Sequence, residues 1–397
     1  MSTSHASGLH ARWQLPSGLA EVLPPEGTRY EALRRQLLDL FDSWGYELVI
    51  PPLVEYLDSL LIGSGGDLDL QTFKLTDLES GRTLGVRADM TPQVARIDAR
   101  QSEAHGINRL CYIGTVLRTL PDGVARSRSP VQVGAELYGH AGVESDVEVV
   151  TLMLETLTAA AIKPLHLELG HVGIFRRLAA RAGLEASRQA ALFEALQRKS
   201  GTDVRAIAGG LPPSPWRDGL VALNELHGDL HTLARAREVL GSGDAEIHAA
   251  LGQLEQLAAG VTSRVSPVEV HIDLAELRGY HYHPGVVFAA YTSGHGEEIA
   301  RGGRYDDIGA AFGRARPATG FSTDLRTLLL LGGPRPISRE VIEAPADGSP
   351  AMGAEVRRLR AAGRRVVERL PGASRHPDCT HELQVDGGGR VVLKALD

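Results

Sequence analysis

One stretch of the chain, Arg278 to Asp307, gathers side chains that could bind a small planar molecule. It reads Arg-Gly-Tyr-His-Tyr-His-Pro-Gly from position 278 and Arg-Gly-Gly-Arg-Tyr-Asp-Asp from position 301. The glycines allow close backbone approach, and the tyrosines and histidines offer flat faces with polar tips. Arg278 and Arg304 supply fixed charge. Together these residue types favour a pocket for a small, planar, charged ligand.

Two other interpretations of this stretch stay open on these residues alone. Aromatic residues at alternating strand positions commonly fill a core. His281 and His283, with His295 nearby, could bind a metal, but no neighbouring cysteine or carboxylate pattern completes a coordination sphere. We therefore expect no metal and no other cofactor.

A second candidate lies at the expected start of a helix, in Arg-Ala-Asp-Met-Thr-Pro at positions 87–92. Thr91 is a favourable N-cap residue and Pro92 a favourable first helical residue. A helix start accounts for Thr91 but leaves Asp89 unexplained. A carboxylate just before a helix could hold the ammonium group of a ligand, because the helix dipole keeps the carboxylate ionised.

A third candidate is the strand expected at 131–138. Gln132, Gly134 and Glu136 recur with period two, so they share one face, while valine, alanine and leucine fill the other. A face with glutamine and glutamate among apolar neighbours is either exposed to water or lines a polar pocket. Both interpretations stay open.

The elements that must position these residues alternate between helices and strands. Helical spacing of apolar residues from Tyr30 to Trp44 predicts a helix that Gly45 ends, followed by a strand at 47–50. Further strands are expected at 73–76, 83–87, 109–117, 165–169, 268–274 and 286–291. Helices are expected at 143–161 and after the stretch that ends at Thr327. Residues 172–261 have only helical spacings. Residues 351–370 predict a helix with an arginine-rich face, which is either solvated or, less commonly for such a face, a contact for nucleic acid or protein.

The predicted organisation has four parts. Residues 1–14 form a flexible start, 15–171 and 262–331 a core, 172–261 an all-helical insertion, and 332–397 a small C-terminal domain that includes a hairpin around 386–389.

Composition excludes several classes of protein. Aspartate and glutamate outnumber lysine and arginine by 49 to 42, so nothing in the overall charge favours a nucleic-acid partner. Two cysteines are too few for a disulfide framework and suit a reducing cytoplasm. No apolar run approaches the ~20 residues of a membrane span, and the first residues do not have the pattern of a signal peptide.

The order of the motifs resembles the catalytic core of the histidyl-tRNA synthetases, which are class II aminoacyl-tRNA synthetases. The resemblance covers roughly 15–331 outside the helical insertion, and it implies an α+β fold with a mixed, largely antiparallel sheet flanked by helices. It also implies that the helix ending at Gly45 and the strand after it form a homodimer contact. By matching position, the ammonium group of histidine would contact Asp89, Thr91 and Gln132, and its carboxylate would contact Arg118 and Arg278. Its imidazole would lie near Glu136, His283 and Tyr305, with Tyr282 beside them.

The departures from the synthetases lie on the ATP side of the site. Leu120 occupies the position where the synthetases have an acidic residue that recognises adenine, and Thr327 the position where they have an arginine that stacks on adenine. Arg326 is adjacent to Thr327 but would point about 100° away on a helix. The C-terminal segment is also smaller than a usual anticodon-binding domain.

This pattern resembles the ATP phosphoribosyltransferase regulatory subunits of histidine biosynthesis. The resemblance implies a cytoplasmic, non-catalytic subunit that pairs with a short-form catalytic subunit, is required for its activity and binds histidine for feedback, without tRNA or membrane. The alternatives are a divergent, active histidyl-tRNA synthetase and an interaction module with a vestigial pocket.

Overall fold

The computed structural model describes residues 14–62, 66–100, 106–121, 127–240, 243–277, 285–333, 340–346 and 349–396. The chain divides into two compact units, Met1–Gly333 and Pro334–Asp397.

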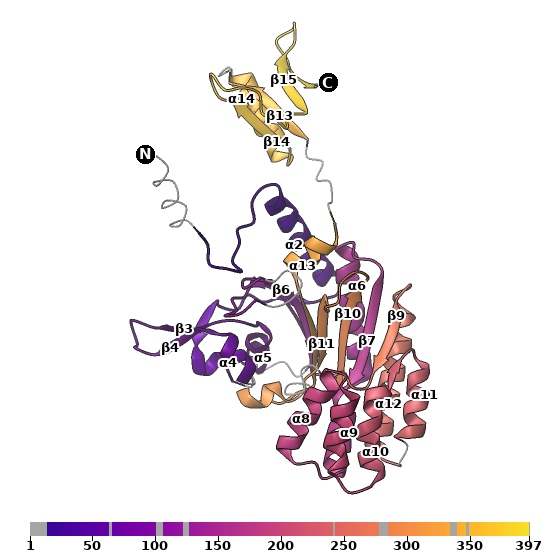
Figure 1. The fold of residues 1–397 in the computed structure, drawn as a ribbon. Helices are drawn as coiled ribbons and strands as arrows, with labels where there is room; N and C mark the ends of the chain where they lie inside the picture. The colour runs from indigo at the N-terminus through magenta and orange to yellow at the C-terminus, as the bar shows by residue number, and fades with distance from the viewer. Residues whose placement is uncertain are drawn as a thin grey trace, which may run out of the picture. The chain divides into compact units, whose positions relative to one another are not determined.

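The first unit is built on a large mixed sheet (Figure 1). In the described residues it has nine strands, in the spatial order β1-β5-β6-β12-β11-β10-β7-β9-β8. The pairs β1–β5 and β7–β9 are parallel, and the other neighbouring pairs are antiparallel. The predicted fold class, a largely antiparallel mixed sheet with helices, is confirmed. The strands are β1 (Glu47–Leu48), β5 (Asn108–Thr115), β6 (Val131–Tyr138), β7 (Leu165–His171), β8 (His227–Gly228), β9 (Glu269–Asp273), β10 (Val286–Thr292), β11 (Ala300–Arg304) and β12 (Ala318–Asp324).

One face of this sheet packs against helices α2 (Glu26–Ser43), α6 (Val143–Ala159) and α13 (Leu325–Leu331). Helix α2 buries Leu33, Leu37 and Phe41, which recur every four residues, so the helix predicted there is confirmed. Gly45 follows α2 with a φ of 76°, a conformation that glycine adopts without steric cost. The apolar residues of β6 belong to this core, which leaves its polar residues on the opposite face.

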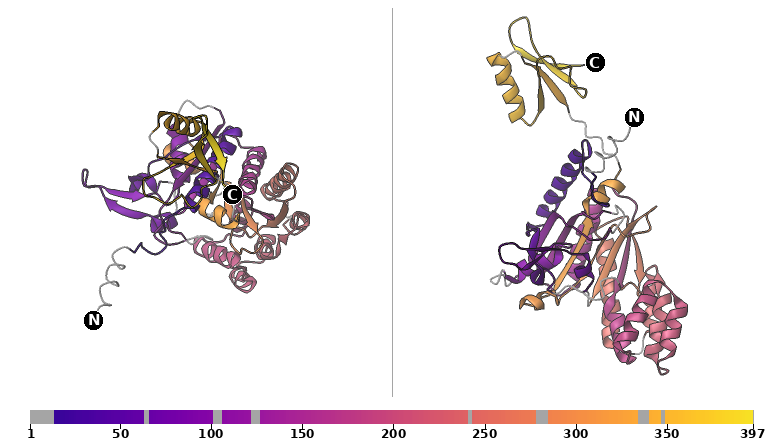
Figure 2. Two further views of the ribbon diagram at one scale, coloured as in Figure 1. Left: turned by 90° about the horizontal axis from the view of Figure 1, so that it is seen from above. Right: turned by 60° about the vertical axis from the view of Figure 1, so that its left-hand side comes forward.

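The opposite face carries a second, smaller core around α5 (Thr91–Arg100). Buried members of this core include Met90, Val94, Tyr112 and Tyr305. A three-stranded sheet of β2 (Val54–Tyr56), β4 (Thr83–Val86) and β3 (Phe73–Thr76) lies in the same part of the chain, and the β3–β4 hairpin projects from the unit (Figures 1 and 2). Short helices complete this region: α3 (Leu57–Leu60), α4 (Gly66–Gln71) and the 3-10 helix η2 (Ile308–Phe312).

In the described part of the insertion between β7 and β9, the regular elements are helices and the two-residue strand β8. Helices α8 to α11 gather beyond one end of the sheet (Figures 1 and 2), whereas α12 also packs against α6 and β7. The all-helical prediction missed β8, because two residues are too few to show a strand period and their pairing with β9 is set by the fold. The helices are α7 (Val172–Arg181), α8 (Ala186–Gln197), α9 (Gly201–Gly209), α10 (Pro215–Ala222), η1 (Leu223–Glu225), α11 (His231–Val239) and α12 (Ala245–Thr262).

The second unit is a four-stranded sheet, within the described residues, with one helix on it. Its strands follow the order β14-β13-β15-β16. The helix predicted at 351–370 is wrong in length: α14 ends at Ala361, Gly363 turns with a φ of 76°, and the chain continues as a strand. The arginines at 364 and 365 therefore lie outside the helix. The elements are β13 (Val341–Pro345), α14 (Pro350–Ala361), β14 (Arg365–Arg369), β15 (His381–Val385) and β16 (Val391–Ala395).

Candidate functional site

A chain of hydrogen bonds begins where α5 starts beside β6. The side-chain amide of Gln132 donates to Asp89 at 2.9 Å, and the Gln132 carbonyl oxygen accepts from the backbone N–H of Met90 at 2.8 Å. The same Asp89 oxygen accepts from the backbone N–H of Thr91 at 2.8 Å. Gln132 is buried, so these bonds fix the position of the Asp89 carboxylate at the start of the helix.

Helix α5 includes Thr91, so the prediction that Thr91 is the residue preceding the helix is wrong. The Thr91 hydroxyl lies 3.1 Å from the Tyr112 hydroxyl, while Asp89 accepts the hydrogen bond from the Thr91 N–H. Asp89 therefore has a structural role as an acceptor at the start of the helix, and the Thr91 hydroxyl points toward Tyr112.

The chain of hydrogen bonds ends at Glu136, which is 1% exposed. Tyr112 donates to one carboxyl oxygen at 2.9 Å, and Tyr305 donates to the other. The Tyr305 hydroxyl also lies 3.5 Å from that of Tyr138. Burial raises the pKa of Glu136 to about 8, although the donors Tyr305 and Tyr112 act in the opposite direction. This carboxyl group therefore changes protonation near neutral pH and can donate to or accept from a nitrogen heterocycle.

Two glycines make room for this carboxyl group and its tyrosine donor. Gly320 pairs with Glu136 across β12 and β6, and a Cβ on Gly320 would lie 1.6 Å from a Glu136 carboxyl oxygen. Gly134 pairs with Tyr112 across β6 and β5, and a Cβ there would lie 2.4 Å from the Tyr112 ring. No side chain larger than hydrogen fits at either position without displacing the network.

The structure brings together most of the residues that the sequence singled out for a ligand. Asp89, Thr91, Gln132, Glu136 and Tyr305 form the network above. Arg118, three residues after the end of β5, lies beside the network, because its Nε donates at 3.3 Å to the carbonyl of Ala88, the residue before Asp89. The three remaining predicted ligand residues, Arg278, Tyr282 and His283, lie outside the described residues, as does His281.

Arg304 was expected to supply charge to the pocket, and this is wrong. It pairs with Thr319, so strand alternation turns its side chain toward α6, away from the face that carries Glu136. There the buried guanidinium donates to Asp146 at 2.9 Å and to the hydroxyl of Ser145 at 2.8 Å. Arg304 ties β11 to the start of α6.

Sequence reasoning missed Tyr112, the residue that links the two ends of the network. Its hydroxyl contacts both Thr91 and Glu136, and its side chain is fully buried. The available signal was the glycine at position 134 within an otherwise bulky strand, which indicates a side chain approaching from the next strand.

The positions that depart from the synthetase pattern have purely structural surroundings. Thr327 is buried in the first turn of α13, where its hydroxyl donates to Asp324, the N-cap residue, at 3.0 Å. Arg326 instead donates to the backbone carbonyl of Ala20 at 3.0 Å. Leu120 is 68% exposed. Thr327 and Leu120 carry no charge, and the charged group of Arg326 is bonded to the backbone of Ala20.

Within the described residues, no cluster of three or more histidine, cysteine, aspartate or glutamate side chains could hold a metal ion. Among the same residues, no helix is both long and apolar enough to cross a membrane.

Two family models match the chain. Residues 18–328 match the histidyl-tRNA synthetase family, and residues 339–392 match the ATP phosphoribosyltransferase subunit HisZ C-terminal domain.

Relatives with high identity cover nearly the whole chain. An ATP phosphoribosyltransferase regulatory subunit from Thioalkalivibrio sulfidiphilus is 57% identical over 91% of this chain and 92% of its own length. Another, from Alkalilimnicola ehrlichii, is 52% identical over 97% of this chain and 98% of its own length.

Solved structures share the fold. An ATP phosphoribosyltransferase regulatory subunit/histidyl-tRNA synthetase from Bacillus halodurans superimposes with a TM-score of 0.80 and 27% identity, covering 91% of this chain and 94% of that chain. Histidyl-tRNA synthetase from Nostoc sp. has the same fold, with a TM-score of 0.77 at 18% identity over 96% of this chain and 97% of that chain.

Proposed function

Because the chain belongs to the ATP phosphoribosyltransferase regulatory subunits, we propose that it binds L-histidine around Glu136 and conveys feedback to a catalytic partner. The observation that carries this proposal is the buried carboxyl group of Glu136, held between the hydroxyls of Tyr112 and Tyr305. A buried carboxyl group with a pKa of about 8 matches an imidazole, whose own pKa is about 6.5. One proton can then be shared between the two groups at neutral pH.

The other end of the network suits the amino-acid part of the same ligand. Asp89, oriented by Gln132, is an acceptor for an ammonium group. The Arg118 guanidinium lies next to it, on the carbonyl of Ala88, and can pair with the carboxylate of the same ligand. A zwitterion with an imidazole side chain satisfies these three kinds of group together. Selectivity for histidine over other amino acids would then depend on Glu136.

The relatives are named regulatory subunits, and this name is the basis for proposing a catalytic partner. The proposed complex contains a short-form catalytic subunit in the cytoplasm and no tRNA.

The proposed homodimer contact is the edge formed by α2 and β1, since Leu48, Ile50 and Leu53 are 44%, 81% and 49% exposed there. Exposed apolar residues beside an edge strand are typical of an interface.

Histidine can regulate the complex only if it binds one conformation of the assembly better than another. A coupling free energy of about 1–3 kcal/mol, as in other allosteric systems, would change the activity roughly 5- to 150-fold at saturation. The proposal therefore predicts that histidine inhibits the phosphoribosyltransferase activity of the complex by binding to this chain and does not need a site on the catalytic subunit.

The test is a two-component assay of phosphoribosyltransferase activity, titrated with histidine. Catalytic subunit with wild-type chain should be active and inhibited, and catalytic subunit with Glu136→Gln should be equally active but much less sensitive to histidine. Glu238→Gln, which alters an exposed carboxylate on α11, is the matched control and should respond like wild type.

Two outcomes would contradict the proposal in distinguishable ways. If Glu136→Gln leaves the inhibition unchanged and calorimetry detects no histidine binding to the isolated chain, the pocket is vestigial and the effector binds elsewhere. If the wild-type chain fails to activate the catalytic subunit, the assignment of the partner is wrong.

A further inference from the structure

The backbone of Arg118, the described arginine proposed to contact the histidine carboxylate, is held by one other residue. Arg118 lies three residues after the end of β5. Its backbone N–H donates to the carbonyl of Arg128 at 2.8 Å, and its own carbonyl accepts from Nε of Arg128 at 3.2 Å. Both polar groups of the Arg118 backbone are therefore bonded to Arg128.

Arg128 is held in turn by the segment that precedes α2. Its backbone N–H donates to the carbonyl of Gly18 at 2.7 Å, and its Nη1 donates to the carbonyl of Ser17 at 3.2 Å. Its guanidinium carbon lies 5.2 Å from the centre of the Phe73 ring, within the range of a cation–π contact. Arg128 and Ser17 are 111 positions apart in the sequence, so the fold brings them together.

Gly18 fits against Arg128 because it has no side chain. Its φ is 78°, a conformation that residues with a Cβ rarely adopt. A Cβ at this position would lie 2.8 Å from Cγ and 2.9 Å from Cδ of Arg128. Any larger residue would therefore displace the Arg128 side chain, which makes the bonds to Ser17 and Arg118.

The side chain of Arg118 reaches the histidine site. Its Nε donates at 3.3 Å to the carbonyl of Ala88, the residue before Asp89. A side chain that contacts a ligand is placed precisely only when the residues behind it hold it in position. The bonds from Arg128 give this support at the backbone of Arg118.

We propose that Arg128, held by Ser17 and Gly18, is a positioning residue for the contact between Arg118 and the histidine carboxylate. The role rests on the histidine site proposed above. Its effect is confined to the carboxylate end of the ligand, because Asp89 and Glu136 are oriented by hydrogen-bond partners of their own.

The test is calorimetric titration of the full-length chain with histidine and with histidinol, in which an alcohol group replaces the carboxylate. Arg128→Ala should weaken histidine binding roughly 2- to 12-fold, the loss that corresponds to one hydrogen bond, and should bind histidinol like wild type. Gly18→Ala should change the two affinities in the same way. In an Arg118→Ala background, Arg128→Ala should cause no further loss of histidine affinity. A purely structural role would instead weaken both ligands alike.

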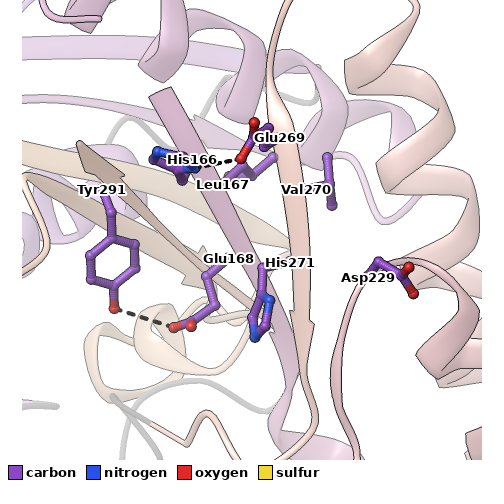
Figure 3. Close-up of a pocket in the computed structure, with 8 residues that line it drawn as sticks. All are labelled: His166, Leu167, Glu168, Asp229, Glu269, Val270, His271 and Tyr291. Atoms are coloured by element: carbon purple, nitrogen blue, oxygen red, sulfur yellow. Dashed lines mark hydrogen bonds and ion pairs between the residues drawn. The ribbon is translucent and has the colours of Figure 1, made fainter. Parts of the chain in front are cut away.

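Two control variants alter charged residues elsewhere in the first unit. Arg82→Ala removes an arginine whose guanidinium carbon lies 3.5 Å from the centre of the Tyr56 ring, in the same small sheet as Phe73. Glu269→Gln alters a pocket of about 600 Å³ on β7, β9 and β10 (Figure 3), where Glu269 lies 3.0 Å from His166. None of the predicted histidine contacts lines that pocket, so both variants should bind histidine and histidinol like wild type.

The unfavourable outcomes are distinguishable. If the wild-type chain binds no histidine, or Glu136→Gln binds it equally tightly, the proposed histidine site is wrong and so is the role of Arg128. If Glu136→Gln weakens binding but Arg128→Ala leaves the ratio of the histidine and histidinol affinities unchanged, only the role of Arg128 is wrong. A loss of histidine affinity in Glu269→Gln would overturn the proposal by placing the ligand in the other pocket.

Discussion

Replacing Glu136 by glutamine should change how the stability of the first unit depends on pH. Glu136 is 1% exposed, and burial raises its pKa from the usual 4.5 to about 8. A carboxyl group with a raised pKa in the folded state favours folding when protonated. Its contribution is therefore fully present below pH 4.5 and is lost as the pH rises toward 8.

The size of the effect follows from the same values. Between pH 4.5 and 8 the folded chain holds one proton that the unfolded chain has released. The free energy of unfolding should thus fall by about 1.4 kcal/mol per pH unit on account of this group, to a total of about 5 kcal/mol. Glutamine preserves the shape of the side chain and does not ionise. The decline should accordingly disappear in Glu136→Gln.

The assay is urea unfolding at a series of pH values, followed by tryptophan fluorescence. Trp44 and Trp216 pack against the core of the first unit, so their signal reports on the unit that holds Glu136. The quantity to compare is the difference in unfolding free energy between variant and wild type at each pH, because groups common to both proteins cancel. This difference should grow in favour of the variant from pH 5 to pH 8.

Glu148→Gln is a control with the opposite sign. Burial alone would raise the pKa of Glu148, but its ion pair with Arg109 lowers it below the usual value. Its stabilisation is present above pH 4.5 and is lost only as the pH falls through the lowered pKa, so this variant should not alter the slope between pH 5 and 8. If the profiles of Glu136→Gln and wild type run parallel over that range, the Glu136 carboxyl group is not protonated in the folded chain, and the reasoning about proton sharing with an imidazole fails.

Two other variants test the geometry of the site. Tyr112→Phe removes the hydroxyl that links the two ends of the network, and it should weaken histidine binding by about 0.5–1.5 kcal/mol in calorimetry. Tyr46→Phe removes a hydroxyl bonded to a different carboxylate and should bind histidine like wild type; equal affinities for both variants would exclude Tyr112 from the site. Gly320→Ala puts a methyl group where the Glu136 carboxyl oxygen lies, so histidine binding should be lost and thermal stability reduced. Gly209→Ala, at a position with open space, is its control, and an alanine at position 320 that leaves binding intact would contradict the placement of the glutamate.

The sequence determined features that depend on local periodicity. The alternation in 131–138 placed Gln132 and Glu136 on one face and the apolar residues on the other, and β6 has those bounds. The helix from Tyr30 onward was predictable for the same reason, because a repeat of 3.6 residues is visible in a short window. The C-terminal hairpin was predictable from the glycines of its turn at 387–389. The order of motifs indicated the family, and it also predicted that Asp89, Gln132 and Glu136 belong to one site, where the network of hydrogen bonds joins them. That this site holds a ligand stays a prediction.

Only the tertiary structure decided which strands lie side by side and in what register. The pairing of β5 with β6 puts Tyr112 opposite Gly134 and so between Thr91 and Glu136, which are 21 and 24 positions away in the sequence. The pairing of β11 with β12 turns Arg304 toward α6, whereas its sequence motif suggested the pocket. Register is set by contacts between distant segments, and a shift of one residue moves every side chain to the other face. No local pattern in the sequence carries that information.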